Sequence, residues 1–132
     1  MLTPQATDRP RFLLTKPVIV LESVTSAALS SALDGLSLRQ RAIANNIANV
    51  NTAGYHAQRV SFEDALVDSV RSGSGVTAPL IQRSLEPTDL NGNNVNLDTE
   101  TLSNIDTVLR YQFAARAVEG TFTSVRSAMR TS

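Results

Sequence analysis

The sequence contains no cysteine and no tryptophan, and aromatic residues make up only 5% of its 132 residues. Without cysteine, the chain cannot form a disulfide or a cysteine-based metal site. Lys+Arg and Asp+Glu both number 12, so the net charge is zero. Nucleic acid and anionic membrane surfaces attract a basic excess, which this chain lacks. The composition therefore argues against a nucleic-acid partner and predicts a thin core of small aliphatic side chains.

Long hydrophobic runs are also missing. Lys16 and Pro17 interrupt the apolar residues near the N-terminus, whereas a membrane span needs about 20 consecutive apolar residues. We therefore expect no direct membrane span and no cleaved signal peptide. Residues 1–20 carry three prolines and no helical period. Two interpretations stay open for them: a disordered tail, or a misassigned start in which translation begins at a GTG codon for Val20.

Residues that could carry catalysis are scarce. His56 is the only histidine, and neither a paired-histidine metal motif nor a G-x-S-x-G nucleophile motif occurs. Glu63 and Asp64 fall in the first turn of a predicted short helix, where carboxylates usually complement the helix dipole. We therefore expect no enzyme, no cofactor and no metal site. A small hydrolase that uses His56 is the catalytic alternative, and no second residue supports it.

Two long amphipathic helices are predicted, one in residues 21–52 and one in residues 98–131. In both, apolar side chains recur at steps of three and four, which is the pattern of a coiled-coil stripe. We expect the two helices to pack on each other as a coiled-coil-like hairpin. The expected packing residues are Leu29, Leu33, Leu36, Ile43, Ile47, Val108, Tyr111, Val118, Phe122 and Val125. The second helix carries another apolar stripe beside its packing residues, which consists of Leu102, Ile105, Leu109 and Phe113.

Residues 53–97, between the two helices, are predicted to form a turn, a short helix and an irregular loop. Ser61 is the expected N-cap of the short helix Phe62–Arg71, and Asp98 is the expected N-cap of the last helix. Val76–Leu85 is a candidate strand within the loop. The predicted fold class is therefore mainly α, with long N- and C-terminal helices and a short central helix.

The energetics of the two helices point to neighbouring subunits. Gly35 and Gly120 lie inside them and cost about 1 kcal/mol each relative to alanine. Three explanations for Gly35 stay open: a close approach by another part of the chain, a bend in the helix, or a tolerated glycine on the surface. The conformational entropy lost on folding costs about 1.5 kcal/mol per residue, and each Å² of buried apolar surface contributes about 25 cal/mol of stability. With few aromatic residues, we expect an isolated chain of near-zero stability that completes its contacts on assembly.

An asparagine-rich stretch stands at the end of the first helix. Residues 44–55 read Ala-Asn-Asn-Ile-Ala-Asn-Val-Asn-Thr-Ala-Gly-Tyr. They resemble the motif A-x-N-I-A-N-x-x-T-P-G-Y of the flagellar rod, hook and hook-filament-junction family. Ala53 replaces the proline of the motif, which makes the turn less rigid. The resemblance assigns an assembly motif to Asn46, Ile47, Ala48, Asn49, Thr52, Gly54, Tyr55 and the following Phe62.

A second such stretch precedes the last helix. Residues 91–100 are similar to the D-G-N-N-V-x-L-D-x-E run of the proximal rod proteins in this family, with Asn91 in place of the aspartate. The run Arg110-Tyr111-Gln112 also fits, and it lacks a following asparagine that the other small proximal rod subunit carries. The second motif is assigned to Gly92, Asn93, Asn94, Val95 and Glu100. The amides either fix the register at an interface or simply end the helices.

The resemblance implies a structural subunit of the proximal rod of the bacterial flagellar basal body, which self-assembles through its terminal helices. Such subunits leave the cell through the flagellar type III export apparatus without a cleaved signal. The implied partners are other rod subunits, the adaptor between membrane ring and rod, and the flagellar export gate. The alternatives are another small rod or hook subunit and, outside the family, a soluble helical coiled-coil adaptor.

Overall fold

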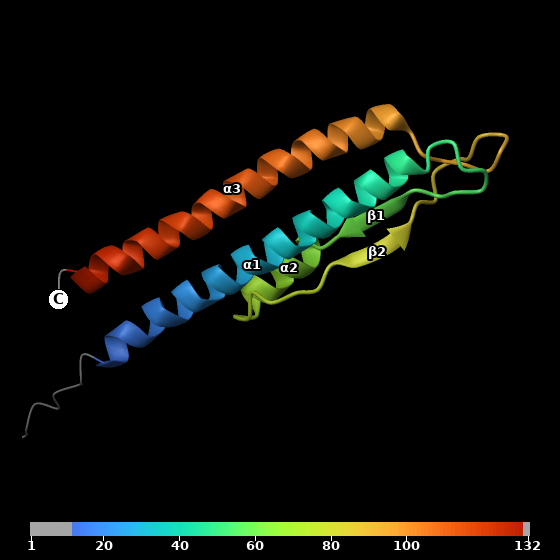
Figure 1. Ribbon diagram of the computed structural model, residues 1–132. Helices are drawn as coiled ribbons and strands as arrows, with labels where there is room; N and C mark the ends of the chain where they lie inside the picture. Colours follow the sequence, from blue (N-terminus) through green and yellow to red (C-terminus); the bar gives the residue numbers. More distant parts are fainter. Residues whose placement is uncertain (1–11, 131–132) are drawn as a thin grey trace, which may run out of the picture.

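Two long helices dominate the computed structural model, which describes the backbone of residues 12–130 and the side chains of residues 21–130. The elements in chain order are α1 (Phe12–Ala48), β1 (Gln58–Ser61), α2 (Glu63–Arg71), β2 (Leu80–Arg83) and α3 (Leu97–Arg130). Helices α1 and α3 run antiparallel as a hairpin, and α2 and the strands lie along α1 rather than along α3 (Figure 1). The expected mainly α fold with long terminal helices is confirmed.

Helix α1 begins and ends earlier than the sequence predicted. Its backbone is helical from Phe12, so the expectation of a disordered tail through residue 20 is wrong from there on; residues 1–11 lie outside the described residues. Pro17 is only the sixth residue of the helix, where its missing N–H removes one backbone hydrogen bond from a 37-residue helix. At the other end, the helix stops at Ala48 rather than near residue 52. The Asn49 N–H is shared between the carbonyls of Asn45 and Asn46, both at 3.1 Å, which marks the tightening turn.

The middle of the chain contains a two-stranded antiparallel sheet. Gln58 lies opposite Arg83, and Ser61 lies opposite Leu80. Strand β2 falls within Val76–Leu85, so that strand prediction is confirmed in part. Its partner β1 occupies a segment for which no strand was predicted.

Helix α2 starts differently from its prediction. Ser61 is the last residue of β1, and Phe62 takes the N-cap position without a side-chain cap hydrogen bond. The Glu63 carboxylate instead accepts a hydrogen bond from the Phe62 N–H at 3.2 Å. Ser61 is the last residue of the paired strand β1, so the predicted N-cap at Ser61 is wrong.

The core lies where Phe62 packs against α1. An added Cβ at Gly35 would lie 2.5 Å from the Phe62 ring, so the glycine marks a close approach by a side chain. The guanidinium carbon of Arg39 lies 4.9 Å from the centre of the same ring. Arg39 also donates to the Val60 carbonyl at 2.8 Å and pairs with Glu63 at 2.6 Å. The buried residues of this core are Leu36, Ala42, Val60, Phe62 and Ala114.

The contact between α1 and α3 follows a different line on α3 from the predicted stripe. Thr107 and Ala114 are buried there, and small side chains of this kind let two helices approach closely. Of the expected packing residues, Leu36 and Ile43 are buried, Leu29, Leu33, Val108 and Val118 are partly buried, and Ile47, Tyr111, Phe122 and Val125 are exposed. Two of the exposed residues, Phe122 and Val125, still line a hollow between α3 and α1, so the packing of this set stays a prediction. No helix in the described part of the chain is long and apolar enough to cross a membrane.

Candidate functional site

The two asparagine-rich stretches meet at the closed end of the hairpin, where α1 ends and α3 begins. The Gly54 N–H donates to the Asn91 carbonyl at 2.9 Å, and the Asn94 N–H donates to the Tyr55 carbonyl at 3.2 Å. A Cβ at Gly92 would lie 3.3 Å from the Gly54 Cα, and both glycines have positive φ, 80° and 74° respectively. Glycine is the residue that adopts this backbone without strain. The two stretches thus form one unit, which we call the polar hub and define as residues 45–59, 84–86 and 91–100.

Asn93 holds the end of α1 from a distance in sequence. Its side chain is buried, and its Nδ2 donates to the carbonyls of Asn49 at 2.9 Å and Thr52 at 2.8 Å. The last carbonyls of a helix and its following turn lack intrahelical partners. Its Oδ1 accepts from the Val95 N–H at 2.7 Å. A side chain 44 positions along the chain therefore satisfies the end of the first helix.

Asn94 links the segments on either side of the small sheet. Its Oδ1 accepts from the Ala57 N–H at 2.7 Å, just before β1. Its Nδ2 donates to the carbonyls of Ser84 at 3.3 Å and Glu86 at 3.1 Å, just after β2. Asn93 thus binds the turn that follows α1, whereas its neighbour Asn94 binds the segments that flank the two strands.

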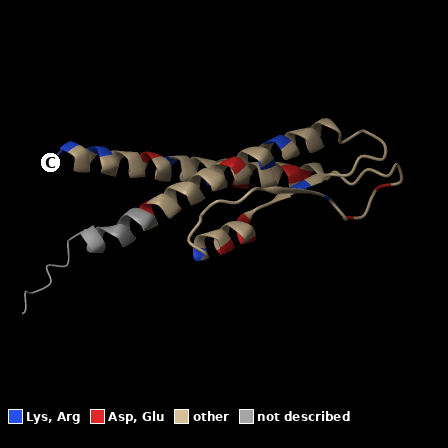
Figure 2. Cartoon of the chain, turned by 90° about the horizontal axis from the view of Figure 1, so that it is seen from below, with Lys and Arg blue, Asp and Glu red and all other residues tan. Residues whose placement is uncertain are grey.

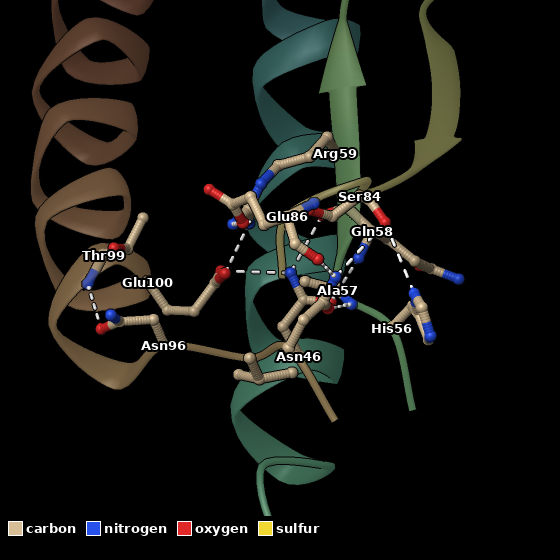
Figure 3. A network of polar contacts seen from close by, with 12 residues as sticks. Asn46, His56, Ala57, Gln58, Arg59, Ser84, Glu86, Asn96, Thr99 and Glu100 are labelled. Carbon is tan, nitrogen blue, oxygen red and sulfur yellow. Dashed lines mark hydrogen bonds and ion pairs between the residues drawn. The ribbon is translucent and has the colours of Figure 1, made fainter. Parts of the chain in front are cut away.

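Asn46 is a fully buried side chain near the end of α1 (Figure 3). Its Nδ2 donates to the Gln58 carbonyl at 2.9 Å and to Glu100 Oε2 at 3.1 Å. Its Oδ1 accepts from the Gln58 N–H at 2.8 Å and from the Tyr55 hydroxyl at 3.2 Å. A primary amide has two donor hydrogens and two acceptor lone pairs, and all four positions are used here. The amide therefore fixes one arrangement of helix and strand.

Glu100 brings α3 into the hub. Its side chain is fully buried, and its Oε1 pairs with Arg59 Nη1 (Figure 3). Arg59 also pairs with Glu86 at 2.8 Å. Partial burial acts to lower the pKa of Arg59, but its hydrogen bonds to Glu100 and Glu86 outweigh burial and raise the pKa. A buried charge is tolerated only when it is paired and hydrogen-bonded, and this one meets both conditions.

Asn96, not Asp98, caps α3. The Asn96 Oδ1 accepts from the N–H groups of Asp98 at 3.0 Å and Thr99 at 3.2 Å. The prediction of Asp98 as N-cap is therefore wrong, because the helix begins at Leu97 and its N-cap position falls on Asn96. Asp98 lies inside the first turn, where its charge still complements the helix dipole.

Most motif residues predicted from the sequence have their polar groups satisfied within the chain. Asn46, Phe62, Asn93, Asn94, Val95 and Glu100 are buried, whereas Ile47, Ala48, Thr52 and Gly54 are exposed. The residue that the sequence reading missed is Arg59. A single arginine shortly after the first motif carries no local signal of a carboxylate partner 41 positions away.

His56, the residue on which the hydrolase alternative depends, lies beside Ser84. Its Nδ1 lies 3.5 Å from the Ser84 carbonyl oxygen, and the Ser84 hydroxyl donates to Glu86 at 2.9 Å. Among the described residues, no group of three or more histidine and carboxylate side chains is placed to hold a metal ion. The hub is an arrangement that holds helices and strands together.

Comparison with known proteins relates the chain to flagellar rod proteins. Residues 28–56, which include the whole first motif, match the family described as Flagella basal body rod protein. The chain is 28% identical over 123 residues to the flagellar basal body rod protein FlgB of Bacillus subtilis (strain 168), covering 83% of this chain and 95% of the relative. It is 29% identical over 119 residues to FlgB of Escherichia coli (strain K12), covering 71% of this chain and 86% of the relative. The resemblance to a small flagellar rod protein is thus confirmed, at modest identity over most of the chain.

Proposed function

We propose that the chain is a structural, non-catalytic subunit of the proximal rod of the flagellar basal body, and that it self-assembles through its two terminal helices. The comparisons support a basal-body rod subunit. The structure supports the finer proposal through the shape of the chain, which is two long helices held at one end by the polar hub.

The observation that carries the assembly proposal is the exposed side of α3. Leu102, Ile105, Leu109 and Phe113 are 69%, 53%, 61% and 77% exposed. They follow one another at steps of three and four, so they form one continuous apolar line. Contiguous apolar surface of this kind marks an interaction site in a soluble protein. In an assembled rod, this line would be covered by neighbouring subunits.

The position in the flagellum is part of the same proposal. We place the chain in the basal body, exported by the flagellar type III apparatus without a cleaved signal peptide. Its partners there are other rod subunits, the adaptor between membrane ring and rod, and the export gate. This placement rests on the resemblance of residues 44–55 and 91–100 to the rod-family motifs.

An in-frame deletion tests the function. Cells that lack the chain should be non-motile in soft agar, and their purified basal bodies should lack a rod. Re-expression of the wild-type chain should restore both, and a tagged chain should co-purify with basal bodies. A deletion strain that swims normally and assembles complete rods would contradict the proposal.

Two variants separate the alternatives. His56→Ala should complement the deletion fully, whereas a hydrolase that uses His56 would lose function. A soluble adaptor would restore motility without remaining in washed basal bodies. Recovery of the tagged chain only in the soluble fraction would therefore favour the adaptor.

A further inference from the structure

The apolar line on α3 ends in an aromatic side chain followed by a cation. Phe113 is 77% exposed, and Arg116 follows it almost one helical turn later and is also exposed. Thr107 and Ala114, which face α1, are buried about 100–120° around the helix from Phe113. Residues three apart lie side by side on a helix surface. Phe113 and Arg116 therefore project together, away from the rest of the chain.

A hollow of about 250 Å³ lies on the other side of the molecule, between the start of α2 and the segment that leads into β2. Asp64 lies at its edge and is exposed, and Leu80 in its wall is 55% exposed. Asp68 lies one turn along the same helix, so the outer side of α2 is acidic (Figure 2). The residues that line the hollow are Ser61, Phe62, Glu63, Asp64, Ala65, Ala78 and Leu80.

These two surfaces cannot meet within one chain. The hollow lies with α2 along α1, whereas α3 packs on α1 and not on α2 (Figure 1). A contact between the two would therefore join different copies, with a different surface used on each. Repeated head-to-tail contacts of this kind close into a ring or extend as an open helical assembly, depending on the rotation between copies.

We propose that Phe113 of one copy enters the hollow beside Asp64 of a second copy, with Arg116 paired to that aspartate. The occupant is a second copy because one neutral chain carries both complementary halves, an aromatic–cationic projection and an apolar hollow with an acidic edge. This inference rests on the proposed self-assembly and names the surfaces that carry it. Buried aromatic and arginine anchors typically dominate the energy of such interfaces.

The absence of cysteine allows a direct test by disulfide formation, because each added cysteine is then the only thiol in its chain. Chains that carry Phe113→Cys and chains that carry Ala78→Cys are purified, mixed and oxidised. The mixture should form a dimer between the two variants, and each variant alone should form little. Leu90→Cys, in the exposed loop before α3, is the control for random collision. Dimers no more abundant than those with the Leu90→Cys control would overturn the proposal, as would a dominant dimer of Phe113→Cys with itself.

A charge exchange provides the second test. Arg116→Asp and Asp64→Arg should each weaken self-association, measured by sedimentation velocity, at least about tenfold. The chain with both substitutions restores the opposite charges across the interface, so its self-association should recover. Arg126→Asp, an exposed charge change elsewhere on α3, should have little effect. Circular dichroism confirms that each variant is folded. Failure of the double variant to recover would contradict the pairing.

Motility separates this inference from the proposed function. If the wild-type chain complements the deletion but the Phe113→Cys and Ala78→Cys variants do not cross-link in basal bodies, the rod function stands and the docking surface is wrong. A cross-link from Phe113→Cys to a different protein would also leave the rod function standing and show that the proposed docking surface is wrong. If the wild-type chain does not complement at all, the rod function itself fails.

Discussion

Replacing Glu100 by glutamine tests the centre of the polar hub with almost no change in shape. The two carboxylate oxygens have different partners: Oε1 accepts from Arg59, and Oε2 accepts from Asn46. A glutamine side chain has one oxygen, so one of these two donors must face an NH₂ group instead. The variant therefore removes a buried charge and leaves one donor without an acceptor.

The expected loss follows from those two changes. A buried donor without a partner costs about 1–3 kcal/mol. Removing one partner of a buried ion pair costs about 3–5 kcal/mol when the other charge is left uncompensated. Arg59 keeps Glu86 at 2.8 Å and is 34% exposed, so the ion-pair part is smaller here. We expect Glu100→Gln to lower the free energy of unfolding by about 2–4 kcal/mol, combining these ranges.

Urea unfolding followed by circular dichroism measures this loss, in a buffer with added sulfate, which strengthens apolar burial and so raises the low stability expected for the isolated chain. Glu119→Gln, an exposed glutamate in the same helix, is the matched control and should change stability by less than about 0.5 kcal/mol. The double variant with Arg59→Ala should lose less than the sum of the two single losses, because both remove the same pair. A loss below about 1 kcal/mol for Glu100→Gln would refute the reasoning, since it would mean that the buried carboxylate is not held as the structure shows.

Three further outcomes follow from the same contacts. Gly35→Ala should lower the free energy of unfolding by about 1–3 kcal/mol, because its Cβ would lie 2.5 Å from the buried Phe62 ring. Gly120→Ala, whose Cβ would have nothing within 4 Å, should raise it by about 0.5–1 kcal/mol. Urea unfolding of both variants tests this contrast. Asn93→Ala should cost about 1–2 kcal/mol and expose the end of α1 to faster amide hydrogen exchange, and unchanged exchange there would contradict its capping role. Burial acts to raise the pKa of Glu63, but its hydrogen bonds from Arg39 and the backbone outweigh it and hold the pKa below the usual 4.5. That contribution to stability is present above pH 4.5 and is lost as the pH falls through the lower folded value, so Glu63→Gln should show a shallower loss of stability in acid.

The long helices could be predicted because their signal is local. The apolar spacing in residues 98–131 repeats every three or four positions, and α3 begins within one residue of the predicted start. Pro17 misled the prediction at the other terminus, since a proline stops a helix less effectively in its second turn than in its middle. The side of α3 that faces α1 was harder to predict, because two apolar lines compete there and the contact also uses the small residues Thr107 and Ala114, which belong to neither line.

The contacts of the polar hub could not be predicted, for a different reason. The asparagines were singled out correctly as unusual, but their partners lie up to 54 positions away, as between Asn46 and Glu100. The sequence suggested amides that fix register between subunits. In the structure, the same chemistry fixes the register of α1, β1 and α3 within one chain. A strand at Gln58–Ser61 was missed because its pairing depends on β2 and on the Asn46 amide rather than on a strand-like alternation of its own residues.

A buried hub can nevertheless control an outward-facing surface. Helix α3 rises about 1.5 Å per residue, so fixing Glu100 in its first turn also fixes Phe113, about 20 Å further along the same rigid rod. Between the far ends of α1 and α3 lies a groove of about 620 Å³, lined in part by Leu21, Thr121 and Val125. The hub therefore helps to set the rotation and height of the apolar line, together with the buried contacts of Thr107 and Ala114 with α1. A change at Glu100 or Asn46 should thus impair the docking of Phe113 in any fraction that stays folded, because a rotation of α3 by one residue turns that side chain by about 100°.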